Sequence, residues 1–182
     1  MKVLVIGSGG REHAVCWKIA QSKKIKKIYC APGNGGINKV AEAVDIKTDD
    51  IKALLDFAKS HAIDLTVVGP EAPLVAGIVD LFQKEGLRIF GPSKQLATLE
   101  GSKIFAKEAM KRFGVPTADF KVFKDFDEAK KYVAQKKAPI VIKADGLAQG
   151  KGVFVAQTTE EALTALKSAM VDKVFGSAGE SV

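Results

Sequence analysis

The sequence predicts an α/β protein in which a parallel sheet is followed by a linker helix and a smaller α+β unit. Over the first 92 residues, short apolar runs typical of strands buried on both faces alternate with helix-length segments. Glycine-bearing turns at residues 7–10, 33–36 and 69–73 punctuate these runs. After Pro92 the order of elements changes, which indicates that a second architecture begins there.

The first strand is expected at residues 2–6, where apolar and mostly branched side chains follow one another. The turn at 7–10 ends it, and a helix that is apolar on most sides is expected over residues 11–21. A second strand at 28–30 leads into the glycine-rich turn at 31–36. This order of strand, helix and strand is the start of a parallel sheet.

The next segments continue the alternation. Apolar residues recur with helical spacing on one face of the next helix, at Ile51, Leu54, Leu55 and Ala58. A buried strand at 65–68, a helix through about Lys84 and a short strand at 88–90 follow. Strands and helices joined by short links predict a parallel sheet with right-handed crossovers.

The second half predicts different elements. A helix is expected over 102–113, with Ser102 as its N-cap and Gly114 as a stop signal. Beyond it the pattern predicts strands at 120–123, 139–143 and 153–155, a helix from Asp125 to about Lys136 with an opening like a capping box, and a last helix opening at Thr158. This order predicts a small antiparallel α+β unit.

Composition limits the function classes. With 47% apolar and 27% charged residues, the chain is ordinary for a globular protein and too apolar for a disordered one. The net charge of +7 comes from scattered lysines without interleaved aromatic residues, so we expect no nucleic-acid partner. No apolar run approaches a membrane span and no signal peptide fits, so we expect no membrane association. Cys16 and Cys30 lie in apolar settings, which favours reduced, buried thiols and a cytoplasmic location.

The turn at 7–10 is a candidate anion site, because ligands of parallel sheets lie beyond the carboxyl ends of the strands. Gly7 and Gly9 match the start of a dinucleotide fingerprint, but Glu12 replaces its third glycine, so tight packing of that cofactor is not encoded. Free N–H groups at the helix start and the charge of Arg11 would still attract a phosphate. A tight strand-to-helix turn without a ligand explains the same residues.

A loop with three glycines and a lysine joins the strands expected at 139–143 and 153–155. The loop is one residue too short for a P-loop, lacks Ser or Thr after Lys151, and leads to a strand instead of a helix. A glycine-rich hairpin can instead fold over the phosphates of a nucleotide, as it does in protein kinases. Lys143 at the strand end can reach the same phosphates. A flexible surface hairpin is the alternative.

Several motifs resemble one enzyme family. Residues 3–14 (VLVIGSGGREHA), 31–34 (APGN) and 68–74 (VGPEAPL) resemble the N-terminal domain of the phosphoribosylamine–glycine ligases, also called glycinamide ribonucleotide synthetases. Residues 99–103 (LEGSK) and 139–153 (PIVIKADGLAQGKGV) resemble the ATP-grasp portion of that family. The similarity runs in order over essentially the whole chain. It implies a Rossmann-like, pre-ATP-grasp substrate domain at 1–100, a linker helix region at 101–119 and a partial ATP-grasp subdomain at 120–182.

The resemblance implies a step of purine biosynthesis, in which ATP activates glycine as glycyl phosphate and 5-phosphoribosylamine attacks it to give glycinamide ribonucleotide. By analogy with ATP-grasp enzymes, the ATP-binding residues are expected to be Lys103, Lys143, Asp145, Gly146, Gly150, Lys151 and Gly152. The phosphoribosylamine site is expected to be formed by Gly9, Gly10, Arg11, Glu12, His13, Asn34, Gly69, Pro70 and Glu71. The resemblance assigns no catalytic residue.

The family continues beyond residue 182, so the resemblance implies an N-terminal fragment that is inactive by itself. The magnesium ligands of the family are expected in the absent part, and no metal ligand is assigned here. Two other classes stay open: another ATP-grasp carboxylate–amine ligase, and a non-catalytic nucleotide-binding module. The motifs at 9–13 and 69–74 occur together here, which argues against the former.

Overall fold

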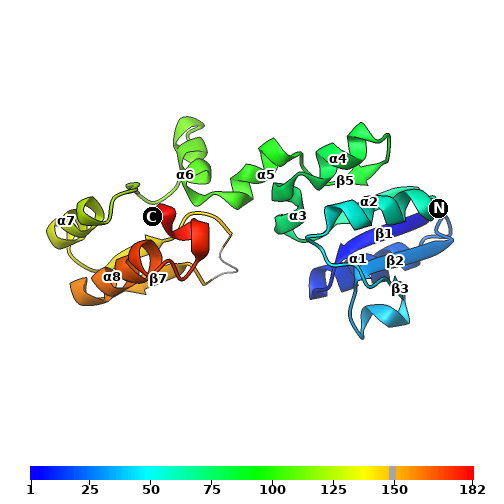
Figure 1. The fold of residues 1–182 in the computed structure, drawn as a ribbon, viewed down its shortest axis with the longest axis horizontal. Helices are drawn as coiled ribbons and strands as arrows, with labels where there is room; N and C mark the ends of the chain where they lie inside the picture. Colours follow the sequence, from blue (N-terminus) through cyan, green and yellow to red (C-terminus); the bar gives the residue numbers. More distant parts are fainter. Residues whose placement is uncertain (148–150) are drawn as a thin grey trace. The chain divides into compact units, whose positions relative to one another are not determined.

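The computed structural model describes residues 1–147 and 151–182. The chain divides into two compact units, Met1–Ala97 and Thr98–Val182 (Figure 1). The first unit is built on a parallel sheet and the second on an antiparallel pair of strands. The predicted class, a parallel α/β domain followed by a smaller α+β unit, is confirmed.

The sheet of the first unit is centred on β1 (Lys2–Gly7). Its neighbours β2 (Lys27–Pro32) and β4 (Leu65–Val68) pair with β1 in parallel, and the short strands β3 (Glu42–Ala43) and β5 (Ile89–Phe90) lie outside them. Within the described residues the strand order is β3-β2-β1-β4-β5. The connections therefore change direction between β1 and β4, and such a change marks the usual ligand site of an open parallel sheet.

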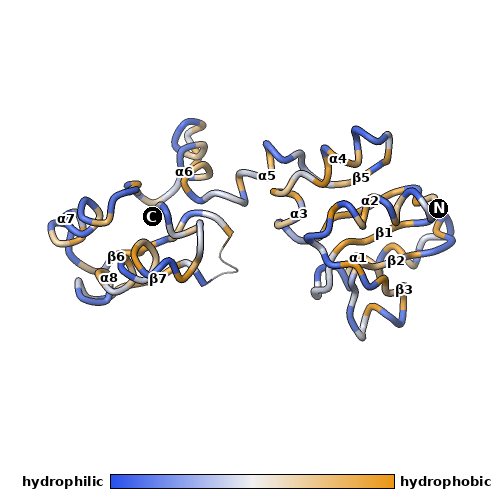
Figure 2. The backbone as a smooth tube through the Cα atoms, viewed as in Figure 1, coloured by the Kyte–Doolittle hydropathy of each residue, from blue (hydrophilic) through white to orange (hydrophobic). Residues whose placement is uncertain are grey.

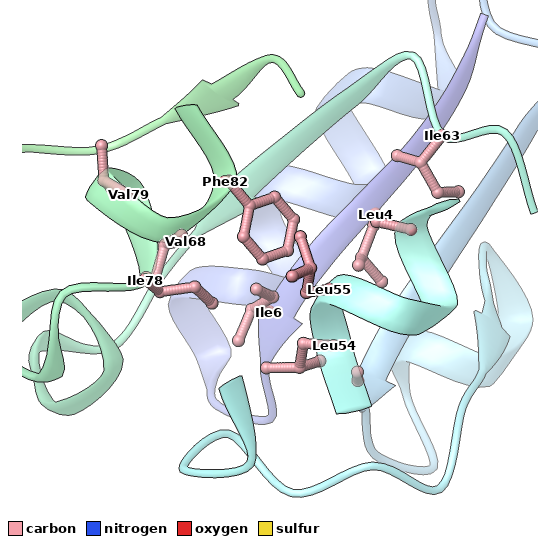
Figure 3. Packing of buried hydrophobic residues seen from close by; sticks show 11 residues of the cluster. Leu4, Ile6, Leu54, Leu55, Ile63, Val68, Ile78, Val79 and Phe82 are labelled. Carbon is pink, nitrogen blue, oxygen red and sulfur yellow. The ribbon is translucent and has the colours of Figure 1, made fainter. Parts of the chain in front are cut away.

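Successive side chains of β1 point to opposite faces of the sheet, and those on both faces are apolar. Helices therefore cover both faces. Leu4 and Ile6 pack with α2 (Ile51–Ser60) and α4 (Ile78–Lys84) around the fully buried Phe82 (Figure 3). Val3 and Val5 face the other side and belong to the cluster that includes Cys16 of α1 (Gly10–Ala20). β1 is accordingly hydrophobic along most of its length (Figure 2).

The helix predicted from the turn at 69–73 through Lys84 is two helices. α3 (Glu71–Ala76) ends at Gly77, whose φ of 97° lies in the left-handed region, and α4 begins directly after it. The Gly77 N–H donates to the carbonyl oxygens of Pro73 and Leu74 and closes α3. Glycine adopts this conformation without a steric penalty, so it redirects the chain at that point.

The second unit is a two-stranded sheet covered by helices. β6 (Ile140–Lys143) pairs antiparallel with β7 (Val153–Ala156), as predicted. The other elements are α5 (Lys94–Gly101, which crosses the boundary between the units), α6 (Lys103–Arg112), α7 (Phe126–Lys136), α8 (Thr159–Leu166), a π-helical turn (Lys167–Val171) and a 3₁₀ segment (Gly176–Glu180). One core joins α7 and α8 to the strands, with Val133, Ile142 and Leu166 among its buried residues. Among the described residues, no helix is both long and apolar enough to cross a bilayer.

The helix starts of the second unit follow the sequence pattern. Ser102 Oγ accepts a hydrogen bond from Phe105 N at 3.0 Å, and Asp125 Oδ1 accepts one from Glu128 N at 2.9 Å. Thr158 opens α8 with a complete capping box. Each of these caps satisfies an N–H group that has no partner inside its helix.

The strand predicted at 120–123 is wrong. Only Phe123 exchanges backbone hydrogen bonds with another segment in this stretch, donating to Val182 O at 2.9 Å and accepting from Val182 N at 3.0 Å. A single residue pair is too short for a strand. The apolar run therefore serves packing, since Phe123 lies against the second unit's core.

Both cysteines are free and buried, as expected, and both lie in the first unit. The Cys30 thiol donates to the carbonyl oxygen of Gly7 at 3.3 Å. A hydrogen bond with Cys16 and burial raise the pKa of the Cys30 thiol, which keeps it protonated. Neither side chain is exposed to solvent, so both act as small core residues.

Candidate nucleotide and substrate sites

Three glycine-bearing loops meet at the carboxyl edge of the parallel sheet, after β1, β2 and β4. The Gly33 N–H donates to Gly7 O at 3.2 Å, and the Gly69 N–H donates to Ile6 O at 3.0 Å. These bonds continue the parallel pairing past the strand ends, so the sheet fixes the loops relative to one another. The turns at 7–10, 33–36 and 69–73 therefore share one edge of the sheet.

Asn34 fastens the second loop to the first. Its Nδ2 donates to Ser8 O at 2.7 Å, while its Oδ1 accepts from the backbone N–H groups of Gly36 and Ile37 at 2.8 and 2.9 Å. His13, on the first turn and a half of α1, lies with its ring against Gly36, where a Cβ would come within 2.8 Å of the ring carbon Cε1. The structure thus brings together His13 and Asn34, two of the expected substrate residues.

Glu12 occupies the space between the loops after β1 and β4. Its side chain belongs to the first turn of α1, and the residue is only 3% exposed. Its Oε2 accepts a hydrogen bond from Gly9 N at 2.7 Å. Its Oε1 is buried and has no hydrogen-bond partner among the described residues. Glu12 therefore faces the protein interior at this edge.

Arg11 is the cation at this edge. Its guanidinium lies 3.7 Å from Glu12 Oε1 through Nε and 3.6 Å from Glu71 Oε2 through Nη2. The Arg11 side chain is 72% exposed, so it remains accessible to a ligand. Gly9 and Gly10 are exposed beside it, and Pro70 precedes the first residue of α3. The edge thus presents an exposed guanidinium above the start of α1.

In the second unit, Asp145 ties the glycine-rich loop to the start of α6. Its two carboxylate oxygens accept from Ser102 Oγ, both at 3.1 Å, and Oδ1 also accepts from Ile104 N at 3.1 Å. Ser102 is the N-cap of α6. Negative charge at a helix N-terminus is favourable because free N–H groups and the helix dipole converge there.

Lys103 lies against the same loop. Its Nζ donates to Gly146 O at 2.8 Å. Gly146 has a φ of 99°, and a Cβ on it would approach the Cβ of Ala178 to 3.2 Å. On the other side the Asp145 N–H donates to Ser181 O at 2.9 Å. The first turn of the loop is therefore held from both sides.

The other predicted ATP-binding residues lie at the ends of the two strands. Lys143 is the last residue of β6, it is exposed, and it pairs in register with Val153 of β7. Lys151 is exposed and Gly152 is buried, and Gly152 O accepts from Ala144 N at 2.8 Å. This bond closes the base of the hairpin. Gly150 lies outside the described residues.

The sequence interpretation missed the role of Ser102 and Ile104 beside Asp145. Ser102 was expected only as a helix cap, and the carboxylate that shares the cap lies 43 residues away in the sequence. No spacing rule connects them, so only the fold reveals the contact. Among the described residues there is no group of three His, Cys, Asp or Glu side chains that could hold a metal ion.

Two family models match consecutive parts of the chain. The family model for phosphoribosylglycinamide synthetase, N domain, matches residues 1–100, and the model for its ATP-grasp (A) domain matches residues 101–182. A phosphoribosylamine–glycine ligase of Halalkalibacterium halodurans is 58% identical over 182 residues, which cover 100% of this chain and 42% of the relative. The chain therefore spans about two fifths of the length of such relatives.

Solved structures resemble this chain over almost its whole length. Phosphoribosylamine–glycine ligase of Thermotoga maritima matches 99% of this chain and 41% of its own, with a TM-score of 0.71 and 30% identity. A biotin carboxylase domain of Hydrogenobacter thermophilus 2-oxoglutarate carboxylase, solved with MgADP, ADP and bicarbonate, matches 99% of this chain and 42% of its own with a TM-score of 0.78. At 22% identity, this second likeness concerns the fold alone. The family models together cover the whole chain, and the chain belongs to the phosphoribosylglycinamide synthetase family.

Proposed function

We propose that this chain is the N-terminal part of an ATP-dependent ligase that joins glycine to 5-phosphoribosylamine. The observation that carries the proposal is the loop of the ATP-grasp-matched unit, where Asp145 and Lys103 hold the first turn at Gly146 against α6. This anchoring prepares backbone N–H groups and ammonium groups for a polyphosphate. The named activity of the relatives, phosphoribosylamine–glycine ligase, supports the choice of substrates.

The chemistry follows from the low reactivity of a carboxylate. Glycine would attack the γ-phosphorus of ATP through a carboxylate oxygen, which forms glycyl phosphate and releases ADP. The amine of 5-phosphoribosylamine would then attack the carbonyl carbon, with loss of phosphate and of one amine proton. Such transfers depend on positioning and on neutralising phosphate charge. Lys103, Lys143 and Lys151, with the N–H groups of Gly146 and Gly152, would supply that charge and those donors.

Magnesium commonly accompanies ATP in such enzymes, and one structural neighbour was solved with MgADP. Among the described residues there is no group of three His, Cys, Asp or Glu side chains that could hold a metal ion without help from a ligand. We therefore assign no step to a metal held by these residues. Metal ligands are proposed to lie in the part of the family beyond this chain.

The sheet edge of the first unit is the proposed site for phosphoribosylamine. Arg11 is exposed there, and Gly9 and Gly10 present the start of α1, which together favour a phosphate. Asn34, His13 and the 69–71 turn lie around the same loops. In this proposal residues 1–100 form the substrate domain, 101–119 the linker helix region and 120–182 part of the nucleotide-binding subdomain of a cytoplasmic enzyme.

The test compares this chain with the same sequence extended to the full length of its relatives. We expect the extended protein to form glycinamide ribonucleotide and release phosphate only when ATP, glycine and phosphoribosylamine are all present. The 182-residue chain should form no product. An extended protein that binds ATP but releases no phosphate with these substrates would contradict the ligase proposal and favour a nucleotide-binding module.

A further inference from the structure

We propose that Glu12 is a positioning residue, whose buried side chain sets the spacing between the loops after β1 and β4 and thereby orients Arg11 for phosphoribosylamine. The inference rests on the proposed function and deepens it. It also replaces the expected direct contact between Glu12 and substrate with an indirect role.

Burial argues against direct contact with substrate. Glu12 is 3% exposed, and its Oε1 is buried as an individual atom. A carboxylate in this setting needs compensation, because removing it from water is costly. The Gly9 N–H at 2.7 Å and the N-terminal end of α1 provide that compensation. The side chain is therefore an internal part of the loops and not a surface ligand group.

The glycines around Glu12 match its shape. A Cβ at Gly7 or Gly69 would overlap the Glu12 side chain, and a Cβ at Gly9 would lie 2.9 Å from Oε2. Gly7 also needs glycine for its backbone, since its φ is 133°. Gly69 has no left-handed φ, so the lack of a Cβ at this position is explained by the space that Glu12 occupies. The loop after β4 thus packs directly on the carboxylate.

Arg11 connects this packing to the surface. Its Nε lies 3.7 Å from Glu12 Oε1, and its Nη2 lies 3.6 Å from Oε2 of Glu71, the first residue of α3, directly after the loop that follows β4. A change in the Glu12 side chain would therefore alter both the distance between the loops and the orientation of the guanidinium. The expected consequence is weaker binding of phosphoribosylamine without a change at the nucleotide site.

The experiment is a double-mutant cycle in the ligase extended to full length, with KM measured separately for phosphoribosylamine and ATP. Gly69→Ala and Glu12→Ala should each raise the KM for phosphoribosylamine by about tenfold and leave the KM for ATP unchanged. The double variant should be no worse than Glu12→Ala, because the new Cβ then enters vacated space. Lys18→Ala, on the exposed side of α1, is the control and should change neither KM.

The variant Glu12→Gln distinguishes the effect of the volume of the side chain from the effect of its negative charge. Glutamine keeps the volume and an acceptor for the Gly9 N–H, so the KM for phosphoribosylamine should stay within about threefold of the parent value. A loss as large as that of Glu12→Ala would overturn the proposal and indicate direct use of the charge. Fully additive effects in the cycle would overturn it as well.

The two proposals can fail separately. An extended parent protein without ligase activity removes the proposed function. The packing of Glu12 against Gly69 is then still tested in the 182-residue chain by thermal denaturation followed through Trp17 fluorescence. Gly69→Ala should lower the Tm when it is introduced into the parent chain, but not when it is introduced into the Glu12→Ala variant. An equal decrease in Tm in both proteins would refute the proposed packing of Glu12 against Gly69.

Discussion

The loop after β1 and the loop after β6 both place glycines beside a helix N-terminus, but they obtain that helix differently. After β1 the chain runs directly into α1, so strand, loop and helix are continuous. After β6 the loop leads to β7, and the helix start beside it belongs to α6, which precedes β6 in the sequence. Asp145 makes that connection through Ser102 and Ile104. In the first unit the helix start comes from the adjacent chain segment, whereas in the second it is brought to the loop by a long-range contact.

The carboxylates of these two loops, Glu12 and Asp145, also differ in their surroundings. Glu12 is buried, one of its oxygens has no hydrogen-bond partner among the described residues, and three glycines leave room for the side chain. Asp145 is only partly buried, and both of its oxygens accept hydrogen bonds. The first loop should therefore be sensitive to side-chain volume, and the second to loss of hydrogen-bond acceptors.

The largest effect is expected from a change in the core of the first unit. It tests whether the two units, which have separate hydrophobic cores, unfold separately. Phe82→Ala removes a fully buried side chain from the first unit and should lower its free energy of unfolding by about 3–5 kcal/mol. Trp17, in the first unit, reports this transition by fluorescence during urea unfolding. Leu166→Ala in the second core is the matched control and should leave the Trp17 transition in place. A shift of equal size in both variants would show that the two units unfold together.

A smaller effect is expected from Lys143, the exposed lysine at the end of β6. In the protein extended to full length, Lys143→Ala should lower kcat by about 100-fold if, as proposed, this cation neutralises developing phosphate charge. Steady-state kinetics with saturating glycine and phosphoribosylamine would measure it. The control is Lys130→Ala, which changes an exposed lysine on α7 and should leave kcat unchanged. Near-parental kinetics of Lys143→Ala would remove this residue from the nucleotide site.

Asp145 and Asp125 form a matched pair, because the carboxylate of each accepts a hydrogen bond from a backbone N–H in the first turn of a helix of the second unit. Each change to Ala should cost about 1 kcal/mol of stability, measured by circular dichroism during thermal unfolding. Only Asp145→Ala should also raise the KM for ATP in the extended protein, since Asp145 lies in the glycine-rich loop and Asp125 does not. A rise of similar size in Asp125→Ala would mean that stability alone controls the KM.

The smallest effect concerns pH. The hydrogen bond from Lys59, at 2.6 Å, and its charge hold the pKa of the Glu85 carboxyl below its usual value. A lowered pKa in the folded state stabilises the first unit above the pKa of the unfolded chain, and this stabilisation is lost as pH falls through the folded value. Glu85→Gln should therefore lower the Tm of the Trp17 transition slightly at neutral pH and not at all in strong acid. Asp172→Asn, which removes the Lys167 pair of the second unit, should leave that transition unchanged at both pH values.

Much of the fold could be predicted because its signals are local. The apolar run of β1, the caps at Ser102, Asp125 and Thr158, and the glycine turns each depend on neighbouring residues. One miss involves a partner distant in sequence, and another a local change of backbone conformation. The apolar segment ending at Phe123 resembles a strand, but it pairs only with Val182. The sequence around Gly77 did not indicate that this residue would adopt a positive φ and separate α3 from α4.

The candidate sites divide in the same way. The glycines and lysines were predicted from the sequence, because phosphate-binding loops need free N–H groups and cations. The burial of Glu12 was not found, because it depends on Gly69, which another strand brings to the same edge. The contact of Asp145 with α6 was not found either, since nothing near Asp145 in the sequence encodes it.

The placement of the cysteines has a practical consequence. Both thiols and the sole tryptophan belong to the first unit, and the thiols are shielded from solvent. A cysteine introduced at the exposed Ser177 would therefore be the preferred target of a maleimide dye in the folded protein. Energy transfer from Trp17 to that dye would then follow the separation of the two units in solution as ATP is added.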